Sequence, residues 1–202
     1  MLQSTSKSVA FFDFDHTLIM GDSFWPYLIY ASGHFAVGVA LIEGLSSFAQ
    51  LRLRGDRTTA MRDFVKASLI RRLLTGKRLG QLQDAAVRVR LWQKINPPIM
   101  QALREHSTKG DKIVIASGGL SLYLPEMLRE IPYDALICTD VGVENNAVTG
   151  EMINGNCVRS GKAERVAAWL ANNGPFDESW AYGNYPHDVP MMNLVKHRII
   201  VS

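Results

Sequence analysis

Short apolar segments alternate with helical segments along most of the chain, and this alternation restricts the fold more than any other feature of the sequence. Five runs are apolar enough for buried parallel strands, namely 9–14, 112–116, 135–138, 179–182 and 198–201. Helices are expected between them, over 97–109, 161–172 (with Ser160 as its N-cap) and 188–196. This order predicts a doubly wound, Rossmann-like parallel α/β sheet, with its functional site at the carboxyl ends of the strands.

Two segments depart from the alternation. Residues 141–154 place apolar residues alternately around Asn145-Asn146, which predicts a small β-hairpin. Residues 21–95 contain no evident strand, and their apolar residues recur at helical spacing. We therefore expect an all-helical cap over 21–95, inserted after the first strand of an α/β core made of residues 1–20 and 96–202.

The first part of the expected cap, Phe24–Leu51, is unusually apolar. It is nearly long enough to cross a bilayer, for which roughly 20 apolar residues are needed. Pro26, His34 and Glu43 interrupt it, so a membrane span is not favoured. A pair of helices that packs on the core, or lies on a membrane surface, is the expected structure.

The charge of the chain is unevenly distributed. A length of 202 residues with 47% hydrophobic content fits a globular protein and excludes disordered, collagen-like and coiled-coil classes. Within a net charge of +3, residues 50–112 hold 15 Lys and Arg against 5 Asp and Glu, whereas the rest holds 7 against 14. The basic segment suggests an anionic partner, such as a phosphate ester, a lipid headgroup or nucleic acid, or it is a solvated helical face.

Two features favour a cytoplasmic location. The only cysteines, Cys138 and Cys157, are isolated, so neither a disulfide framework nor a structural zinc site is expected. The segment Met1–Ser8 is polar and is not expected to be a secretory signal.

The first expected strand runs directly into the segment DFDHTL (Asp13–Leu18), which places two carboxylates two residues apart. Such carboxylates repel each other when buried, and a divalent cation would remove that cost. One carboxylate could then attack phosphorus while the other handles the proton of the leaving group. The alternative is a solvated turn that carries incidental acids.

Three further polar segments follow later strands or open a helix. Ser117-Gly118-Gly119 follows the second strand, where a hydroxyl and backbone N–H groups at a strand-to-helix turn could hold a phosphate. Lys162, in the first turn of a helix, could neutralise charge on a phosphoryl group. Asn184 and Asp188 follow the fourth strand and offer the oxygen ligands that a hard cation prefers. Each segment alone is common, but four in this order predict one site.

This order of motifs resembles the haloacid dehalogenase (HAD) superfamily of aspartate-nucleophile phosphatases, over nearly the whole chain. The resemblance is closest to the phosphoserine-phosphatase-like branch, subfamily IB, whose helical cap follows the first motif. Within that branch, Asp22–Phe24, the hairpin segment and Asn156-Cys157 look like a bacterial group that includes phosphatidylglycerophosphatase-type lipid phosphatases.

The resemblance implies a role for each motif residue. Asp13 would be the nucleophile that forms an aspartyl phosphate. Asp15 would be the general acid and base, and its backbone carbonyl would be a ligand of Mg²⁺. The implied phosphate-binding residues are Ser117, Gly118 and Lys162, and the implied metal ligands are Asp13, Asp15, Asn184 and Asp188.

Two positions depart from the pattern of the superfamily. His16 stands where glycine is common, and it would either reach a substrate or pack at the surface. The fourth motif usually begins Gly-Asp, but here it is Gly183-Asn184, so the site carries one negative charge fewer and attracts Mg²⁺ less strongly.

The expected activity is Mg²⁺-dependent phosphomonoester hydrolysis, with the cap selecting the substrate. One candidate substrate is a small phosphorylated metabolite, such as a phosphoamino acid. The other is a lipid phosphate at an anionic membrane surface, favoured by the apolar stretch beside the basic residues Arg52, Arg54, Arg57, Arg71, Arg72, Lys77 and Arg78. A catalytically weak binding protein is the third interpretation.

Nucleic acid is not an expected partner, because aromatic residues do not interleave with the basic segment. The oligomeric state is left open.

Overall fold

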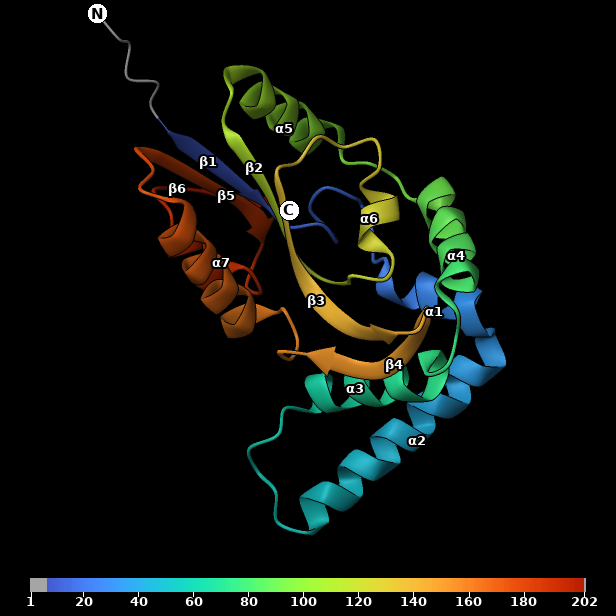
Figure 1. The fold of residues 1–202 in the computed structure, drawn as a ribbon. Coiled ribbons are helices and arrows are strands. Elements are labelled where there is room, and N and C mark those ends of the chain that lie inside the picture. The colour runs from blue at the N-terminus through green and yellow to red at the C-terminus, as the bar shows by residue number, and fades with distance from the viewer. Residues whose placement is uncertain (1–6, 202) are drawn as a thin grey trace, which may run out of the picture.

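The computed structural model describes residues 7–201, so most of the polar N-terminal segment lies outside the described residues. Six strands form one sheet in the order β4-β3-β2-β1-β5-β6 (Figure 1). They are β1 (Ser8–Phe12), β2 (Lys112–Leu120), β3 (Ala135–Glu144), β4 (Ala147–Ile153), β5 (Glu178–Asn184) and β6 (His197–Val201). β1 pairs in parallel with β2 and β5, and β4 pairs antiparallel to β3. From the central β1, the later strands are added on both sides of the sheet, as in the predicted doubly wound α/β fold.

Helices cover both faces of the sheet (Figure 1). These are α5 (Pro97–Lys109) on one face and α7 (Arg159–Asn173) with α8 (Val189–Met192) on the other, and α6 (Leu124–Met127) follows β2. Leu103 of α5 is buried in the same core as Phe12, whereas Val166 of α7 is buried with Phe11. Because successive strand residues point to opposite faces, two neighbouring phenylalanines supply two different cores.

The cap consists of four helices between β1 and α5 (Figure 1). These are α1 (Phe24–Ser32), α2 (His34–Leu53), α3 (Met61–Leu74) and α4 (Leu79–Trp92). The expected insertion of an all-helical cap after the first strand is thus confirmed. The division into two domains at residues 20/21 and 95/96 stays a prediction.

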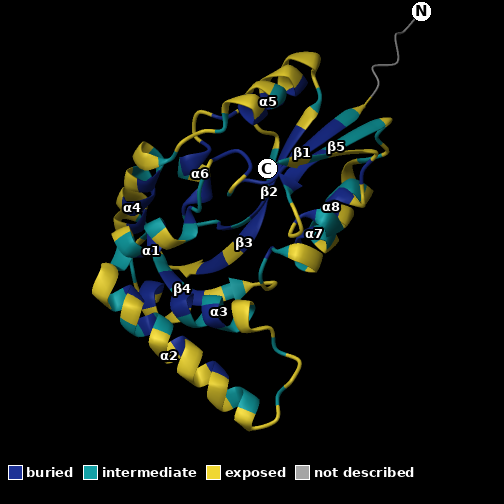
Figure 2. Ribbon diagram, turned by 180° about the vertical axis from the view of Figure 1, so that it is seen from behind, coloured by how far each residue is buried: buried dark blue, intermediate teal, exposed yellow. Residues whose placement is uncertain are grey.

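The apolar start of the cap is divided into α1 and α2 at Gly33, whose φ is +85°. Among the described residues, α2 is the one helix long and apolar enough to cross a membrane, and only 17% of its apolar stretch is buried. Figure 2 shows many exposed residues along α2, at the edge of the molecule. One side of this helix packs on α3, and the other carries apolar residues that face solvent.

Backbone hydrogen bonds attach the cap to the rest of the chain at two places. The two connecting segments run side by side: the N–H of Met20 donates to the Lys94 carbonyl and the N–H of Asn96 to the Leu18 carbonyl, both at 2.8 Å. Elsewhere, the N–H of Gly76, between α3 and α4, donates to the carbonyl of Val148 in β4 at 2.8 Å. The cap is therefore fixed at the hairpin as well as at its connections.

The β3–β4 hairpin confirms the prediction for residues 141–154. Asn145 and Asn146 connect the two strands with φ values of +50° and +64°. Two successive residues with positive φ form the turn that matches the twist of a two-stranded hairpin, and asparagine tolerates this conformation.

The structure corrects two predictions about strands. β1 ends at Phe12, so both Asp13 and Phe14 follow the strand. Ser117–Gly119 lies within β2 rather than in a strand-to-helix turn. The reason is that β2 pairs with β3 again at Leu120 after an irregular step, which keeps the intervening backbone extended.

Two predictions about helices are also wrong in detail. α7 begins at Arg159 with Val158 in extended conformation before it, so Ser160 lies inside the helix and does not cap it. α8 ends at Met192, whereas a helix was expected to continue to Lys196. The chain turns after Met192 in order to enter β6 at His197.

A tight contact between the hairpin and the cap generates a stability prediction. Gly150 in β4 has a φ of +84°, and a Cβ there would lie 2.0 Å from Oγ1 of Thr75 and 3.1 Å from Cα of Arg71. Gly150→Ala is expected to lower the free energy of unfolding by roughly 2–5 kcal/mol, because left-handed strain and overpacking add.

Gly110→Ala is the matched control, because Gly110 has a φ of +83° with nothing within 4 Å of an added Cβ. Its free energy of unfolding should fall only by the cost of a left-handed backbone at alanine, about 1–2 kcal/mol. Urea unfolding measures both variants, and equal losses would contradict the tight packing of β4 on α3.

Candidate functional site

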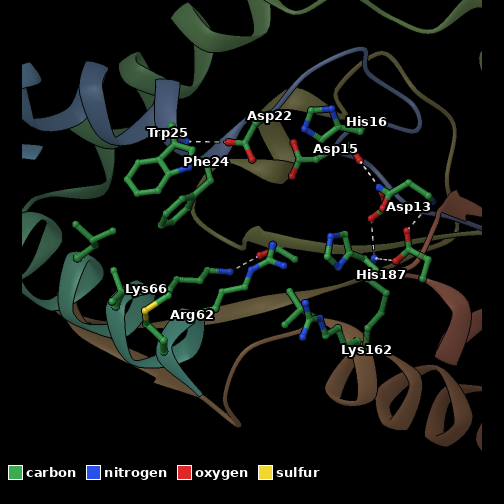
Figure 3. Close-up of a pocket in the computed structure, with 18 of the residues that line it drawn as sticks. Asp13, Asp15, His16, Asp22, Phe24, Trp25, Arg62, Lys66, Lys162 and His187 are labelled. Atoms are coloured by element: carbon green, nitrogen blue, oxygen red, sulfur yellow. Dashed lines mark hydrogen bonds and ion pairs between the residues drawn. The ribbon is translucent and has the colours of Figure 1, made fainter. Parts of the chain in front are cut away.

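A cavity of about 690 Å³ lies between the carboxyl ends of β1, β2 and β5 and the cap helices α1, α2 and α3 (Figure 3). On the core side it is lined by Asp13, Asp15, His16, Gly118, Val158, Arg159, Lys162, Asn184, Tyr185, His187 and Asp188. On the cap side it is lined by Asp22, Phe24, Trp25, Leu41, Leu45, Met61, Arg62, Val65, Lys66 and Leu69. The core side is polar, whereas most of the cap side is apolar.

A buried lysine between two carboxylates forms the floor of the cavity. Nζ of Lys162 lies 2.6 Å from Oδ1 of Asp13 and 2.6 Å from Oδ1 of Asp188. The three residues are 3%, 4% and 2% exposed, respectively. One ammonium shared by two carboxylates leaves one formal negative charge in the cluster without a partner inside it.

The parallel strands explain why these residues meet. Asp13 follows β1 and Asp188 follows β5, and these two strands are neighbours, so their carboxyl ends lie together. The second oxygen of each carboxylate is also held: Oγ1 of Thr17 donates to Asp13 Oδ2, and the N–H of Asn184 donates to Asp188 Oδ2, both at 2.9 Å. Gly183 permits the close approach of Asp188, because a Cβ at Gly183 would lie 2.7 Å from the Asp188 side chain.

The buried cluster shifts the ionisation of its members. Burial raises the pKa of Asp13 and the Asp188 carboxylate adds to this rise, while the Lys162 ammonium opposes it. Burial alone would lower the pKa of Lys162, but Asp13 and Asp188 raise it by more, so the net pKa lies above the usual value. Lys162 therefore stays protonated at neutral pH.

Asp15 lies in a different environment from Asp13. Its Oδ1 accepts a hydrogen bond from the backbone N–H of Ser23 at 2.7 Å. Burial, followed by the Asp22 carboxylate, raises the pKa of Asp15 to about 7. A carboxyl group with this pKa can both give and take a proton near neutral pH.

The structure brings most of the predicted site residues together, with one exception. Gly118 lines the cavity, but Ser117 is fully buried and does not. The Ser117 hydroxyl instead accepts a hydrogen bond from the N–H of Gly119 at 2.9 Å. His16 lines the cavity with a φ of +58°, a conformation that explains why glycine suits this position. Contact between His16 and a substrate stays a prediction.

The oxygen atoms around Asn184 fit a divalent cation. Among residues 7–201, no three His, Cys, Asp or Glu side chains converge as metal ligands, so a cation would depend on other oxygens. Oδ2 of Asp13 and the backbone carbonyl of Asp15 lie 3.5 Å and 3.3 Å from Nδ2 of Asn184, so these groups converge. Oxygen donors beside uncompensated negative charge suit a hard cation such as Mg²⁺.

Sequence reasoning missed two cations in the cavity, Arg62 and Lys66, which extend from α3 (Figure 3). The pKa of Lys66 falls to about 8, mainly because of burial and then because of the nearby Arg62. The available signal was helical spacing: both cations share a face of α3 with the apolar Val65 and Leu69. A charged residue on an apolar helix face indicates that it has a partner in the interior, because an unpaired buried charge is costly.

Comparison with known proteins agrees with the fold. A family model described as haloacid dehalogenase-like hydrolase matches residues 10–193. A relative named histidinol-phosphatase, from Neisseria meningitidis serogroup C (strain 8013), is 21% identical over 203 residues, covering 97% of this chain and 90% of that protein.

Two solved structures share the fold. A protein of unknown function from Bordetella pertussis Tohama I has a TM-score of 0.71 and 24% identity, covering 96% of this chain and 90% of that chain. A phosphoserine phosphatase, solved as a phospho-aspartyl intermediate analogue, has a TM-score of 0.66 and 16% identity, covering 96% and 86% of the respective chains.

The buried cluster generates a second prediction. Lys162→Met should lower the free energy of unfolding by roughly 3–5 kcal/mol, because it leaves two carboxylates buried without their cation. Lys112→Met is the matched control: it removes an exposed pair with Asp134 at 2.8 Å, which is worth about 0–1 kcal/mol. Urea unfolding at neutral pH measures both, and a loss for Lys162→Met as small as that of the control would contradict the role of the cluster in stability.

Proposed function

Since the chain belongs to the haloacid dehalogenase-like hydrolase family, we propose that it is a phosphatase that hydrolyses phosphomonoesters through an aspartyl phosphate, with Mg²⁺ as cofactor. The observation that carries this proposal is the buried Lys162 between Asp13 and Asp188, with Asp15 beside them in one cavity. The similarity to proteins named histidinol-phosphatase and phosphoserine phosphatase supports it.

In the first step, a carboxylate oxygen of Asp13 forms a bond to phosphorus, and the bond between phosphorus and the ester oxygen breaks. Protonated Asp15 gives its proton to that oxygen, so the product leaves as an alcohol. The raised pKa of Asp15, about 7, supports its role as acid. The ammonium of Lys162 stabilises negative charge on the phosphoryl group.

In the second step, a water molecule attacks phosphorus and loses a proton to Asp15, which is now a carboxylate. The bond between phosphorus and the Asp13 oxygen breaks, and inorganic phosphate and the Asp13 carboxylate are regenerated. Thr17, which donates to Asp13 Oδ2 at 2.9 Å, and Lys162 keep this carboxylate in one orientation throughout. Phosphoryl transfer depends mainly on such positioning and on electrostatic stabilisation.

Mg²⁺ would be held by Asp13, the Asp15 carbonyl and Asn184, which lie together; for this the Asn184 amide would turn so that its oxygen, in place of Nδ2, faces the other two. When bound, it supplies positive charge that compensates the phosphoryl oxygens and Asp13. Asp188 accepts hydrogen bonds from Lys162 and from the N–H of Asn184. We therefore propose that Asp188 orients these two residues, in addition to its predicted role as a metal ligand.

The favoured substrate class is a small phosphorylated metabolite. Asp22, Arg62 and Arg159 line the cavity, so charges of both signs are available to bind polar groups on such a molecule. Phe24 and Trp25 of α1 provide apolar contact for its carbon skeleton. This reading agrees with the named relatives, which act on phosphorylated amino acids or alcohols according to their names.

A second candidate is a lipid phosphate at a membrane surface, and the exposed face of α2 favours it. Positions 35, 38, 42, 45, 49 and 53 recur at helical spacing on one side of α2 and are all exposed. Phe35, Ile42 and Leu53 are 85%, 69% and 88% exposed. Leu45 belongs both to this face and to the wall of the cavity. An apolar surface thus continues from the cavity onto α2, and the exposed Arg54 and Arg57 follow.

The proposed chemistry predicts the effect of two substitutions. Asp13→Asn should abolish Mg²⁺-dependent hydrolysis of an aryl phosphate, because the amide cannot attack phosphorus. Asp15→Asn should lower kcat by about 10²–10⁴-fold, the usual value of general acid–base catalysis. Steady-state rates with and without Mg²⁺ provide the measurement. Asp134→Asn, at an exposed position outside the cavity, is the control and should keep its rate. Hydrolysis by Asp13→Asn at the wild-type rate would refute the assignment of the nucleophile.

The lipid candidate predicts binding to vesicles of anionic phosphatidylglycerol that weakens as salt rises, since screening shortens the reach of the arginines. Ile42→Asp should reduce this binding about tenfold or more, because an apolar side chain no longer enters the bilayer. The matched control is Leu91→Asp, which alters a residue of α4 that is 73% exposed and outside the apolar face of α2. Cosedimentation measures binding. If Ile42→Asp instead changes the oligomeric state and no variant binds vesicles, the face is a subunit interface.

A further inference from the structure

Lys66 belongs to the cap, yet each hydrogen bond of its ammonium group reaches the core. Its Nζ lies 2.5 Å from the carbonyl oxygen of Gly118, 2.7 Å from Oδ1 of Asn156 and 3.3 Å from Oγ1 of Thr139. An ammonium group has three protons and no acceptor, so these three acceptors use its full capacity. Asn156 is held in turn by Asp63 of the same helix, with Nδ2 of Asn156 donating to Asp63 Oδ1 at 2.6 Å.

The acceptor at Gly118 matters because this residue lines the cavity where a phosphoryl group would bind. The pairing of β2 with β3 is irregular between Ala116 and Leu120, so the regular sheet ladder does not fix the backbone there. The Gly118 carbonyl is held instead by two hydrogen bonds, from Lys66 and, at 3.0 Å, from Oγ1 of Thr139. One of the two comes from the cap.

We propose that Lys66 is a positioning residue for the phosphoryl group: by binding the Gly118 carbonyl from α3, it fixes the backbone of Ser117–Gly119 against the cavity, so that the site is complete only when the cap is docked. The inference rests on the proposed phosphatase function. It assigns to the cap a part in holding phosphate, besides its part in selecting the organic group.

Lys66 is partly buried, and the position of its ammonium between α3 and the core argues that these bonds have to form together. Removing an ammonium from water is costly unless hydrogen bonds and nearby charges replace the lost solvent. Asp63 of α3 and Asp15 of the core are the carboxylates near it, and Arg62 is a nearby like charge. If α3 moves away from the core, Lys66 loses every acceptor it has in the structure, and Gly118 loses one of its two donors.

The test compares Lys66→Met with Lys77→Met. Lys77 is a matched control because its Nζ donates to the Ala31 carbonyl at 2.9 Å, a bond that stays within the cap. For Lys66→Met, both the KM for an aryl phosphate and the inhibition constant of inorganic phosphate should rise about tenfold, while kcat changes less than about threefold. Contacts to non-reacting oxygens are made by substrate and product alike, so their loss appears in KM. Lys77→Met should leave all three values unchanged.

Asn156→Ala separates positioning from direct contact, because Asn156 is bonded to Lys66 but does not line the cavity. A positioning role predicts that Asn156→Ala raises both constants and that the double variant is no worse than Lys66→Met, since residues of one network are not additive. If Asn156→Ala leaves the KM and the inhibition constant of phosphate unchanged, Lys66 acts on phosphate itself, and the proposal is overturned. A fall in kcat with unchanged KM would reveal a merely structural role and would also overturn it.

Hydrogen exchange tests the contact independently of any activity. In Lys66→Met, amides of α3 and of residues 117–119 should exchange faster than in Lys77→Met. If the wild type hydrolyses no phosphate ester while this difference appears, the proposed function fails and the docking of the cap through Lys66 stands. If exchange is equal in the two variants, the inference fails whatever the activity.

Discussion

The site depends on a single buried cation shared by two carboxylates. Lys162 connects the segment after β1 with the segment after β5, and the cost of burying any one of the three charges makes each of them depend on the other two. Neighbouring residues serve this cluster: Thr17 orients one carboxylate, and Gly183 gives the other the space to approach. Under the proposed function, a divalent cation would compensate the formal negative charge left over in the cluster and so allow an anionic phosphoryl group to approach Asp13.

The sequence predicts the core side of the site well, because the carboxyl ends of parallel strands converge whatever the details of packing. Asp13 and Asp188 meet for this reason, although they are separated by most of the chain. Ser117 does not line the cavity because β2 continues past it, and pairing with β3 could not be read from local residues. Its role in binding phosphate stays a prediction. Lys66 was missed because its acceptors lie 52 to 90 positions away along the chain.

The cavity combines two kinds of surface that arise from different parts of the chain. The core contributes charge and hydrogen-bond donors, whereas α1, α2 and α3 contribute mostly apolar side chains. Under the proposed function, this division would largely separate the reaction from the choice of substrate, with Lys66 of α3 as the exception because it also binds the Gly118 carbonyl. The small metabolite and the lipid phosphate would both use the apolar wall, and they differ in whether the exposed face of α2 extends it.

The two backbone attachments of the cap limit how it can move. One lies at the paired connections near Met20 and Lys94, and the other joins Gly76 to Val148 of the hairpin. Rotation of the cap about the line between these two attachments keeps their backbone hydrogen bonds, whereas other movements strain them. A rocking of α2 and α3 about this line would open the cavity only after the bonds of Lys66 and Asp63 to the core have broken. A translation of the cap away from the sheet would first have to break hydrogen bonds of the backbone.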